Sequence, residues 1–223
     1  MSVALEKPMP EGLAAKLSTL IRAAGRSPRD TVRWLQHLPC WHRSLMTLEL
    51  PWFSYGAIRF LDAWLKPHHA VFEYGGGGSS VFLARRAGEV LTMESDLSWH
   101  AEIERAAAER GLRNIRCEYF DLGDHNAAQF RDNPFFHRIR GRRWDVVVID
   151  CYCGFATSPT GLLRPYAFEL AREFLAPNGI IVLDDYWMFP ELLHPCEEFQ
   201  LHLFRGLGPC NYGIKTTAIF EAR

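Results

Sequence analysis

Four consecutive glycines and a distant acid are the strongest chemical signal in the sequence. Glycines occupy positions 75–78, between the apolar run 70–74 and a segment of helical periodicity that begins at Ser79. Such a turn lets the backbone approach a bound molecule, and the helix start offers free N–H groups. Glu94 ends the next apolar run, where a carboxylate can accept both hydroxyl hydrogens of a ribose. The pair predicts a site for a nucleoside-containing cofactor.

Two neighbours of the glycines argue against a dinucleotide. Ser80 stands where the third glycine of G-x-G-x-x-G would be, and Glu73 places a carboxylate two residues before the turn. That charge would repel a diphosphate, whereas a cationic or zwitterionic ligand would tolerate it. The structural alternative is a tight turn without chemical use, with Glu94 as a surface acid.

Three further acids follow two other apolar runs. Asp150 ends the run 144–150, and Asp184 and Asp185 end the run 179–184. The carboxyl ends of parallel strands meet at one edge of a sheet, and clustered carboxylates there suit a hard cation. The alternative is that Asp184 or Asp185 caps the next helix while Asp150 orders the cofactor loop. Nearby residues that could line an acceptor pocket or act as a base are Tyr152, Tyr186, Trp187 and His194.

The elements that must position these residues alternate between two patterns. Strands are expected at 70–74, 89–94, 114–120, 144–150, 179–184 and 215–221, and helices at 79–87, 97–110 and 162–175. Residues 124–140 are read as partly helical, and 190–205 as a helix that could give way to a strand. This order predicts an α/β fold: a doubly wound, mostly parallel Rossmann-like sheet of about seven strands, with helices on both faces.

The first part of the chain reads as helical. Helices are expected from near Glu11, from Ser27-Pro28 and from Ser54, where Ser is a favoured N-cap. We interpret residues 1–66 as a helical cap or lid within the same domain, and 67–223 as the cofactor-binding domain. The segment 51–55 would form a lid or an acceptor wall.

Composition narrows the class of protein. The chain has 223 residues, 48% of them hydrophobic, and a net charge of -1, which excludes wholesale disorder and any global attraction to nucleic acid or anionic membrane. No apolar run approaches the roughly 20 residues that span a bilayer, and no export signal is visible. We therefore expect a cytoplasmic protein with reduced cysteines, and read the arginines at 138–143 as a solvated face.

These motifs, in their order, carry a family resemblance. Residues 73–79 (EYGGGGS) match the E-x-G-x-G-x-S/T form of the first motif of class I S-adenosylmethionine-dependent methyltransferases. Residues 93–96 with Trp99 resemble the second motif of a bacterial small-molecule branch, and 145–150 and 175–185 resemble later motifs. The resemblance covers about residues 67–221.

The resemblance implies S-adenosylmethionine as cofactor. Glu73 and the backbone of Gly75–Gly77 would flank its methionine moiety, Glu94 would hold the ribose, and Asp121 would lie near the adenine. The implied cofactor-binding set is Glu73, Tyr74, Gly75, Gly76, Gly77, Ser79, Ser80, Glu94, Ser95, Trp99, Asp121 and Asp150.

The implied reaction is methyl transfer to a small-molecule acceptor, at oxygen, with Asp150, Asp185 and Tyr152 as catalytic residues. Small metal-dependent O-methyltransferases, which the acids also resemble, would place Mg²⁺ on Asp150, Asp184 and Asp185. Here Asp185 replaces an Asn, and residues 151–153 replace others that include a lysine, so the metal is left open. Other readings are an aminopropyl- or aminocarboxypropyl-type transferase, or a non-catalytic nucleoside-binding protein. No nucleic-acid or membrane partner is expected, and a homodimer is left open.

Overall fold

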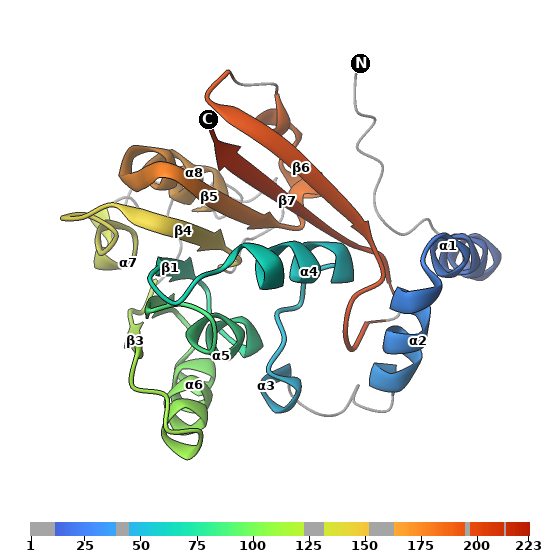
Figure 1. Ribbon diagram of the computed structural model, residues 1–223, viewed down its shortest axis with the longest axis horizontal. Coiled ribbons are helices and arrows are strands. Elements are labelled where there is room, and N and C mark those ends of the chain that lie inside the picture. Colours follow the sequence, from blue (N-terminus) through green and yellow to red (C-terminus); the bar gives the residue numbers. More distant parts are fainter. Residues whose placement is uncertain (1–11, 39–44, 123–131, 152–162, 195–196, 212) are drawn as a thin grey trace.

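A single mixed sheet organises the chain. The computed structural model describes residues 12–38, 45–122, 132–151, 163–194, 197–211 and 213–223. Within these residues seven strands form one sheet in the order β3-β2-β1-β4-β5-β7-β6 (Figure 1). The strands are β1 (Ala70–Tyr74), β2 (Glu89–Glu94), β3 (Ile115–Tyr119), β4 (Trp144–Ile149), β5 (Leu175–Asp184), β6 (Phe199–Gly206) and β7 (Lys215–Ala222).

Strand direction changes at one place. β1 to β5 pair in parallel, whereas β7 pairs antiparallel with both β5 and β6. Because Thr217 of β7 lies opposite Asp184 of β5, the first residues of β7 reach the edge at which β1, β4 and β5 end. This arrangement confirms the predicted doubly wound, mostly parallel sheet.

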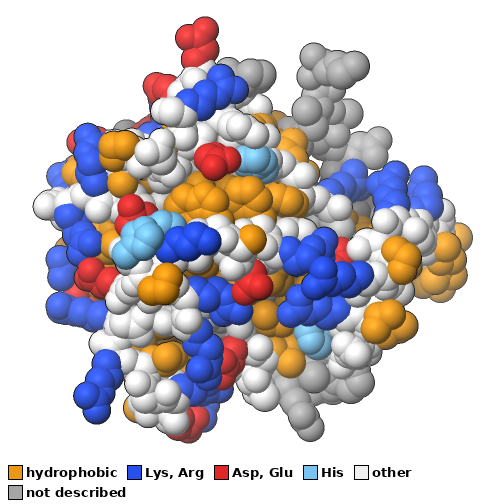
Figure 2. Space-filling model, in the orientation of Figure 1, with side chains coloured by type: hydrophobic (Ala, Val, Ile, Leu, Met, Phe, Trp, Pro, Cys, Tyr) orange, Lys and Arg blue, Asp and Glu red, His pale blue; other side chains and the backbone are white. Residues whose placement is uncertain are grey.

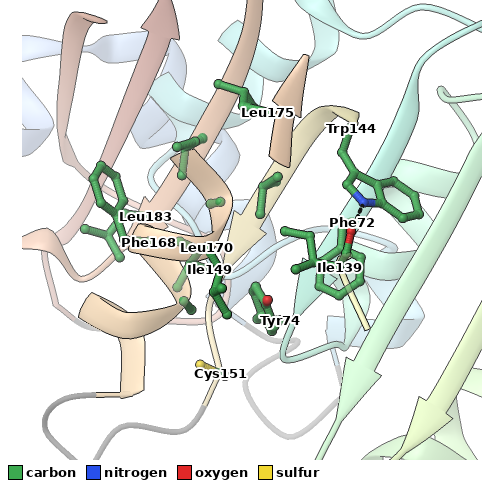
Figure 3. Close-up of a cluster of buried hydrophobic side chains, with 14 of the residues drawn as sticks. Phe72, Tyr74, Ile139, Trp144, Ile149, Cys151, Phe168, Leu170, Leu175 and Leu183 are labelled. Atoms are coloured by element: carbon green, nitrogen blue, oxygen red, sulfur yellow. Dashed lines mark hydrogen bonds between the residues drawn. The ribbon is translucent and has the colours of Figure 1, made fainter. Parts of the chain in front are cut away.

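Both faces of the sheet are covered by helices. Alternate residues of each strand face opposite sides, so Val147 and Ile149 join one core while Val146 and Val148 join the other. The first core, shown in part in Figure 3, packs against α7 (Pro134–His137) and α8 (Leu163–Phe174). The second packs against α4 (Tyr55–Trp64) and α5 (Gly78–Ala84). A third cluster joins α5 to α6 (Leu97–Glu109).

Two ambiguous segments take definite forms. The segment expected at 190–205 contains a short 3-10 helix at Pro190–Leu193 and then β6, because residues from Phe199 onward pair along the whole of β7. A second short 3-10 helix spans Tyr186–Met188. Of the segment 124–140, the described part holds only the short helix α7.

The N-terminal helices differ in how firmly they pack. Ser54 caps α4 as predicted, and its side chain accepts a hydrogen bond from the backbone of Ala57. Ser27 likewise caps α2 (Pro28–His37), and α3 (Leu45–Leu48) is a single short turn. By contrast α1 (Leu13–Arg26) has no buried residue, and hydrophobic side chains lie exposed over it beside Lys and Arg (Figure 2). No helix in the described part of the chain is both long and apolar enough to cross a membrane.

Candidate functional site

A cavity of about 900 Å³ opens at the carboxyl ends of the parallel strands. We call its wall near β1 and β2 the glycine side, and its wall near β5 and β7 the lysine side. Asp150 and Arg164 lie between them, since β4 separates β1 from β5 in the sheet. The glycine side comprises Leu45, residues 75–79, Glu94, Ser95, Asp96, Trp99, Asp121 and Leu122. The lysine side comprises Trp52, Asp184, Asp185, Trp187, Asn211, Gly213, Ile214 and Lys215.

Close packing of the protein explains two of the glycines. Gly75 has φ of +82°, and a Cβ there would lie 2.5 Å from the Cα of Cys151. A Cβ on Gly76 would lie 2.5 Å from Cδ1 of Ile103. Only glycine avoids these overlaps. The turn is thus tight because strands and helices converge on it, and the result is a cavity wall made of bare backbone.

Glu73 and Ser80 support this turn from behind and do not line the cavity. The Ser80 hydroxyl accepts a hydrogen bond from the Gly77 N–H at 3.0 Å and donates one to Oε2 of Glu73 at 2.5 Å. Thr92 donates a second one to the same oxygen at 2.7 Å, while Oε1 has no hydrogen-bond partner within the described residues. Burial raises the pKa of Glu73 to about 7. The sequence predicts that Glu73 and Ser80 contact the cofactor. In the structure both lie behind the glycine turn and hold it in place.

Glu94 lies in the wall itself. Its Oε2 accepts the Gly76 N–H at 2.7 Å, and its Oε1 accepts the N–H groups of Ser95 and Asp96 at 2.7 and 2.8 Å. Burial raises its pKa, which these three bonds oppose. A carboxylate offers about four acceptor positions, so roughly one stays open, on Oε2. Glu94 can therefore accept one further hydroxyl in this geometry, not the two that the sequence led us to expect.

Other predicted cofactor residues divide between wall and core. Ser79, Ser95, Trp99 and Asp121 line the glycine side. Tyr74 does not: its side chain is fully buried, and its hydroxyl donates to the Phe136 carbonyl at 2.9 Å. Figure 3 shows Tyr74 among the core side chains. Because alternate residues of β1 face opposite sides of the sheet, its side chain is part of the core and not of the cavity.

Lys215 dominates the lysine side. Its Nζ lies 2.9 Å from Oδ2 of Asp184 and 3.4 Å from Oδ1 of Asp185, and Thr217 donates to Oδ1 of Asp184 at 2.9 Å. Burial alone would lower the pKa of Lys215, but the carboxylates of Asp184, Asp185 and Asp150 outweigh it and raise that pKa. Lys215 is therefore a buried cation.

Arg164 holds the strand ends together. From α8 it donates to the carbonyls of Cys151 at 2.8 Å and of Asp184 at 2.7 Å, and to Oδ1 of Asp150 at 3.0 Å. Burial raises the pKa of Asp150 to about 6, although the Arg164 charge acts in the opposite direction. The guanidinium thus connects the ends of β4 and β5 and neutralises the acid between them.

The predicted magnesium site is not formed. No group of three or more His, Cys, Asp or Glu side chains in the described part of the chain is arranged to hold a metal ion. Asp150 is bonded to Arg164, and Lys215 lies against Asp184 and Asp185. Since cationic groups of the protein already contact all three acids, this donor set does not fit Mg²⁺.

The remaining predictions for the acceptor side have mixed outcomes. Trp52 and Trp187 line the cavity, whereas His194 and the buried Tyr186 do not. Tyr152 lies outside the described residues. Sequence reasoning missed Arg164 and Lys215. A charged residue at the start of an otherwise apolar strand was the available signal for Lys215, and Arg164 has no local signal.

Comparisons with known proteins address the fold. No protein-family model matches the sequence, and no curated protein matches it. Solved structures do match. A ribosomal RNA methylase from Streptococcus thermophilus superposes with a TM-score of 0.55 at 16% identity, over 75% of this chain and 94% of that chain. The chain has the Rossmann-like fold of class I methyltransferases.

Two other matches have the same fold. A presumed methyltransferase from Streptococcus mutans, in complex with S-adenosylhomocysteine, has a TM-score of 0.53 at 14% identity and covers 75% of this chain and 96% of its own. A presumed O-methyltransferase from Klebsiella pneumoniae has a TM-score of 0.53 at 14% identity and covers 75% and 76%. Since proteins with different acceptors share this fold, it does not select an acceptor.

Proposed function

We propose that the chain is an S-adenosylmethionine-dependent methyltransferase that acts on a small molecule, at oxygen. The observation that carries the proposal is the glycine side of the cavity. There a backbone-lined turn, the Glu94 carboxylate and the Trp99 ring face one space at the carboxyl ends of the strands. This is where doubly wound folds bind nucleoside cofactors.

The residues present fit this cofactor. Glu94 has an acceptor position for a ribose hydroxyl, Trp99 offers a ring face, and Asp121 lies in the same wall. Glu94 is bonded by backbone N–H groups and by no cationic side chain of the described residues, so its negative charge favours a cationic ligand there. S-adenosylmethionine supplies an electrophilic methyl group on a positively charged sulfur.

On the lysine side the protein has to orient the acceptor and accept its proton. Asp185 faces the cavity from a backbone with φ of 51° and ψ of 41°, an unusual conformation for a residue other than glycine. Its side chain is 30% exposed, so it can take up the proton of a bound hydroxyl. Trp52 and Trp187 provide apolar wall for the body of the acceptor.

A small molecule is favoured over nucleic acid by charge. The net charge of the chain is -1, and among the described residues the lysine side carries two carboxylates against the single cation Lys215, a local excess of negative charge that would repel a phosphate backbone. Some proteins with this fold are ribosomal RNA methylases, so RNA is the main competing acceptor. Methylation of small molecules but not of bulk RNA by the purified protein is the expected outcome.

Calorimetry with S-adenosylhomocysteine tests the cofactor. We expect saturable binding at one site, and absence of heat at millimolar concentration would refute the proposal. A donor labelled in its aminocarboxypropyl chain then separates reaction types. Formation of S-adenosylhomocysteine supports methyl transfer. Release of methylthioadenosine, with the label moved to the acceptor, would indicate aminocarboxypropyl-type transfer, and its release from the decarboxylated donor would indicate aminopropyl-type transfer. Binding without turnover over a broad acceptor panel would instead favour a non-catalytic nucleoside-binding protein.

A further inference from the structure

The space around Lys215 is shaped for its side chain. Lys215 is the first residue of β7 and is only 7% exposed. Gly208 leaves room for the aliphatic part of the side chain, because a Cβ there would lie 2.9 Å from Cγ of Lys215 and 2.6 Å from the Phe53 carbonyl. The ammonium also lies 5.4 Å from the centre of the Trp52 ring, within the range of a cation–π contact. The position of the ammonium is thus fixed from several directions.

The ammonium of Lys215 lies against the carboxylates of two consecutive residues. Its nitrogen is 2.9 Å from Asp184 and 3.4 Å from both oxygens of Asp185. We infer that Lys215 occupies the place of a divalent cation, so that the acceptor oxygen is bound by an ammonium N–H and not by a metal ion. The part of this inference that concerns the acceptor rests on the proposed function.

The donor count of the ammonium supports this role. A lysine ammonium has three N–H groups. Asp184 accepts one, and the two nearly equal distances to Asp185 correspond to one shared donor. Since Lys215 lines the cavity, the third N–H is available to an acceptor oxygen there.

Charge balance then restricts the acceptor class. Among the described residues, Asp150, Asp184 and Asp185 pair only with Arg164 and Lys215. With no excess of positive charge, the site would disfavour an oxyanion. The single remaining N–H of Lys215 offers no second partner to a chelating pair of oxygens. The class that fits is a neutral compound with a single reactive hydroxyl.

Manganese binding tests the inference without any acceptor. Mn²⁺ prefers oxygen ligands and is detected directly by electron paramagnetic resonance. We expect no saturable Mn²⁺ site in the wild-type protein up to about 1 mM, a concentration near the dissociation constants of the weakest calcium sites in proteins. Removing the ammonium in Lys215→Ala or Lys215→Gln frees the carboxylates. Each variant should bind Mn²⁺ at least about tenfold more tightly than the wild type, and adding Asp184→Asn should abolish that gain.

Two results would overturn the inference. One is a wild-type Mn²⁺ site that Asp184→Asn removes, which would show that the carboxylates are metal ligands despite Lys215. The other is no gain of Mn²⁺ affinity in either Lys215 variant, when both retain the circular dichroism spectrum of the wild type. If neither variant folds, the wild-type and Asp184→Asn titrations decide by themselves.

The controls separate this inference from the proposed function. Lys66→Ala removes an exposed lysine at the end of α4 and should not change Mn²⁺ binding. Calorimetry with S-adenosylhomocysteine reports on the glycine side alone. If that ligand fails to bind, the proposed function fails while the Mn²⁺ result still stands.

Discussion

The two sides of the cavity satisfy their acids by different means. On the glycine side, Glu94 accepts three backbone N–H groups and contacts no cationic side chain among the residues that the structure describes. On the lysine side, Asp184 pairs with Lys215, and Asp150 beside it pairs with Arg164. Backbone N–H groups satisfy a carboxylate and leave its charge in place, whereas an ammonium or guanidinium cancels it. The cavity is therefore polarised, with its negative charge kept where a cationic ligand would bind.

The largest expected effect concerns the charge pairs. Arg164→Ala would leave the carbonyls of Cys151 and Asp184 without this donor and Asp150 without its cation. Breaking such a buried network should lower the free energy of unfolding by about 4 kcal/mol, measured by urea denaturation. The matched control is Arg172→Ala on the same helix, whose pair with Glu198 is exposed and should contribute less than about 0.5 kcal/mol. Equal losses in the two variants would show that charge pairing does not hold the lysine side together.

The next effect concerns the backbone of the glycine side. Gly75→Ala introduces a Cβ against the Cys151 backbone at a positive φ, and we expect a loss of about 3 kcal/mol in unfolding free energy. Gly206→Ala is the control, because a Cβ there meets nothing within 4 Å. If Gly75→Ala were as stable as Gly206→Ala, the turn would be looser than its contacts indicate.

A third prediction isolates Glu94. Glu94→Ala should weaken binding of S-adenosylhomocysteine about 100-fold, equivalent to ~2.7 kcal/mol, through the lost ribose contact and the three N–H groups left without their acceptor. Calorimetry would measure it. Glu89→Ala at the other end of β2, where Glu89 pairs with the exposed Arg142, should bind normally. Unchanged affinity in Glu94→Ala would place the ligand elsewhere.

The smallest expected effect is on pH dependence. The pKa of Glu73 is raised from 4.5 to about 7 in the folded protein, so the protonated acid is the form that folding favours. The contribution of Glu73 to the free energy of unfolding is present at low pH and falls as pH rises through the folded pKa, by about 2 kcal/mol between pH 5 and 7. Urea denaturation at several pH values should show that the free energy of unfolding falls less steeply with pH in Glu73→Gln than in the wild type. An identical slope would mean that Glu73 is already ionised at pH 5.

Locality explains which parts the sequence could predict. The turn at 75–78 and Glu94 belong to one strand-turn-helix-strand unit, so nearby residues specify the glycine side. Lys215 meets Asp184 only because β7 inserts antiparallel beside β5, a pairing that no local pattern encodes. The same long-range pairing turns part of 190–205 into a strand. The positions of Asp150, Asp184 and Asp185 at strand ends identify them in the sequence. The cations that neutralise them come from distant parts of the chain, so no local pattern indicates them.

Three tryptophans give the cavity a further property. Trp99 lies on the glycine side, and Trp52 and Trp187 lie on the lysine side. Indole emission responds to the polarity and contacts of its surroundings, so a ligand that enters either side changes the environment of a native fluorophore. Single Trp→Phe replacements at these positions would assign the emission change to one wall. The order in which two ligands bind could then be followed in real time, without a label.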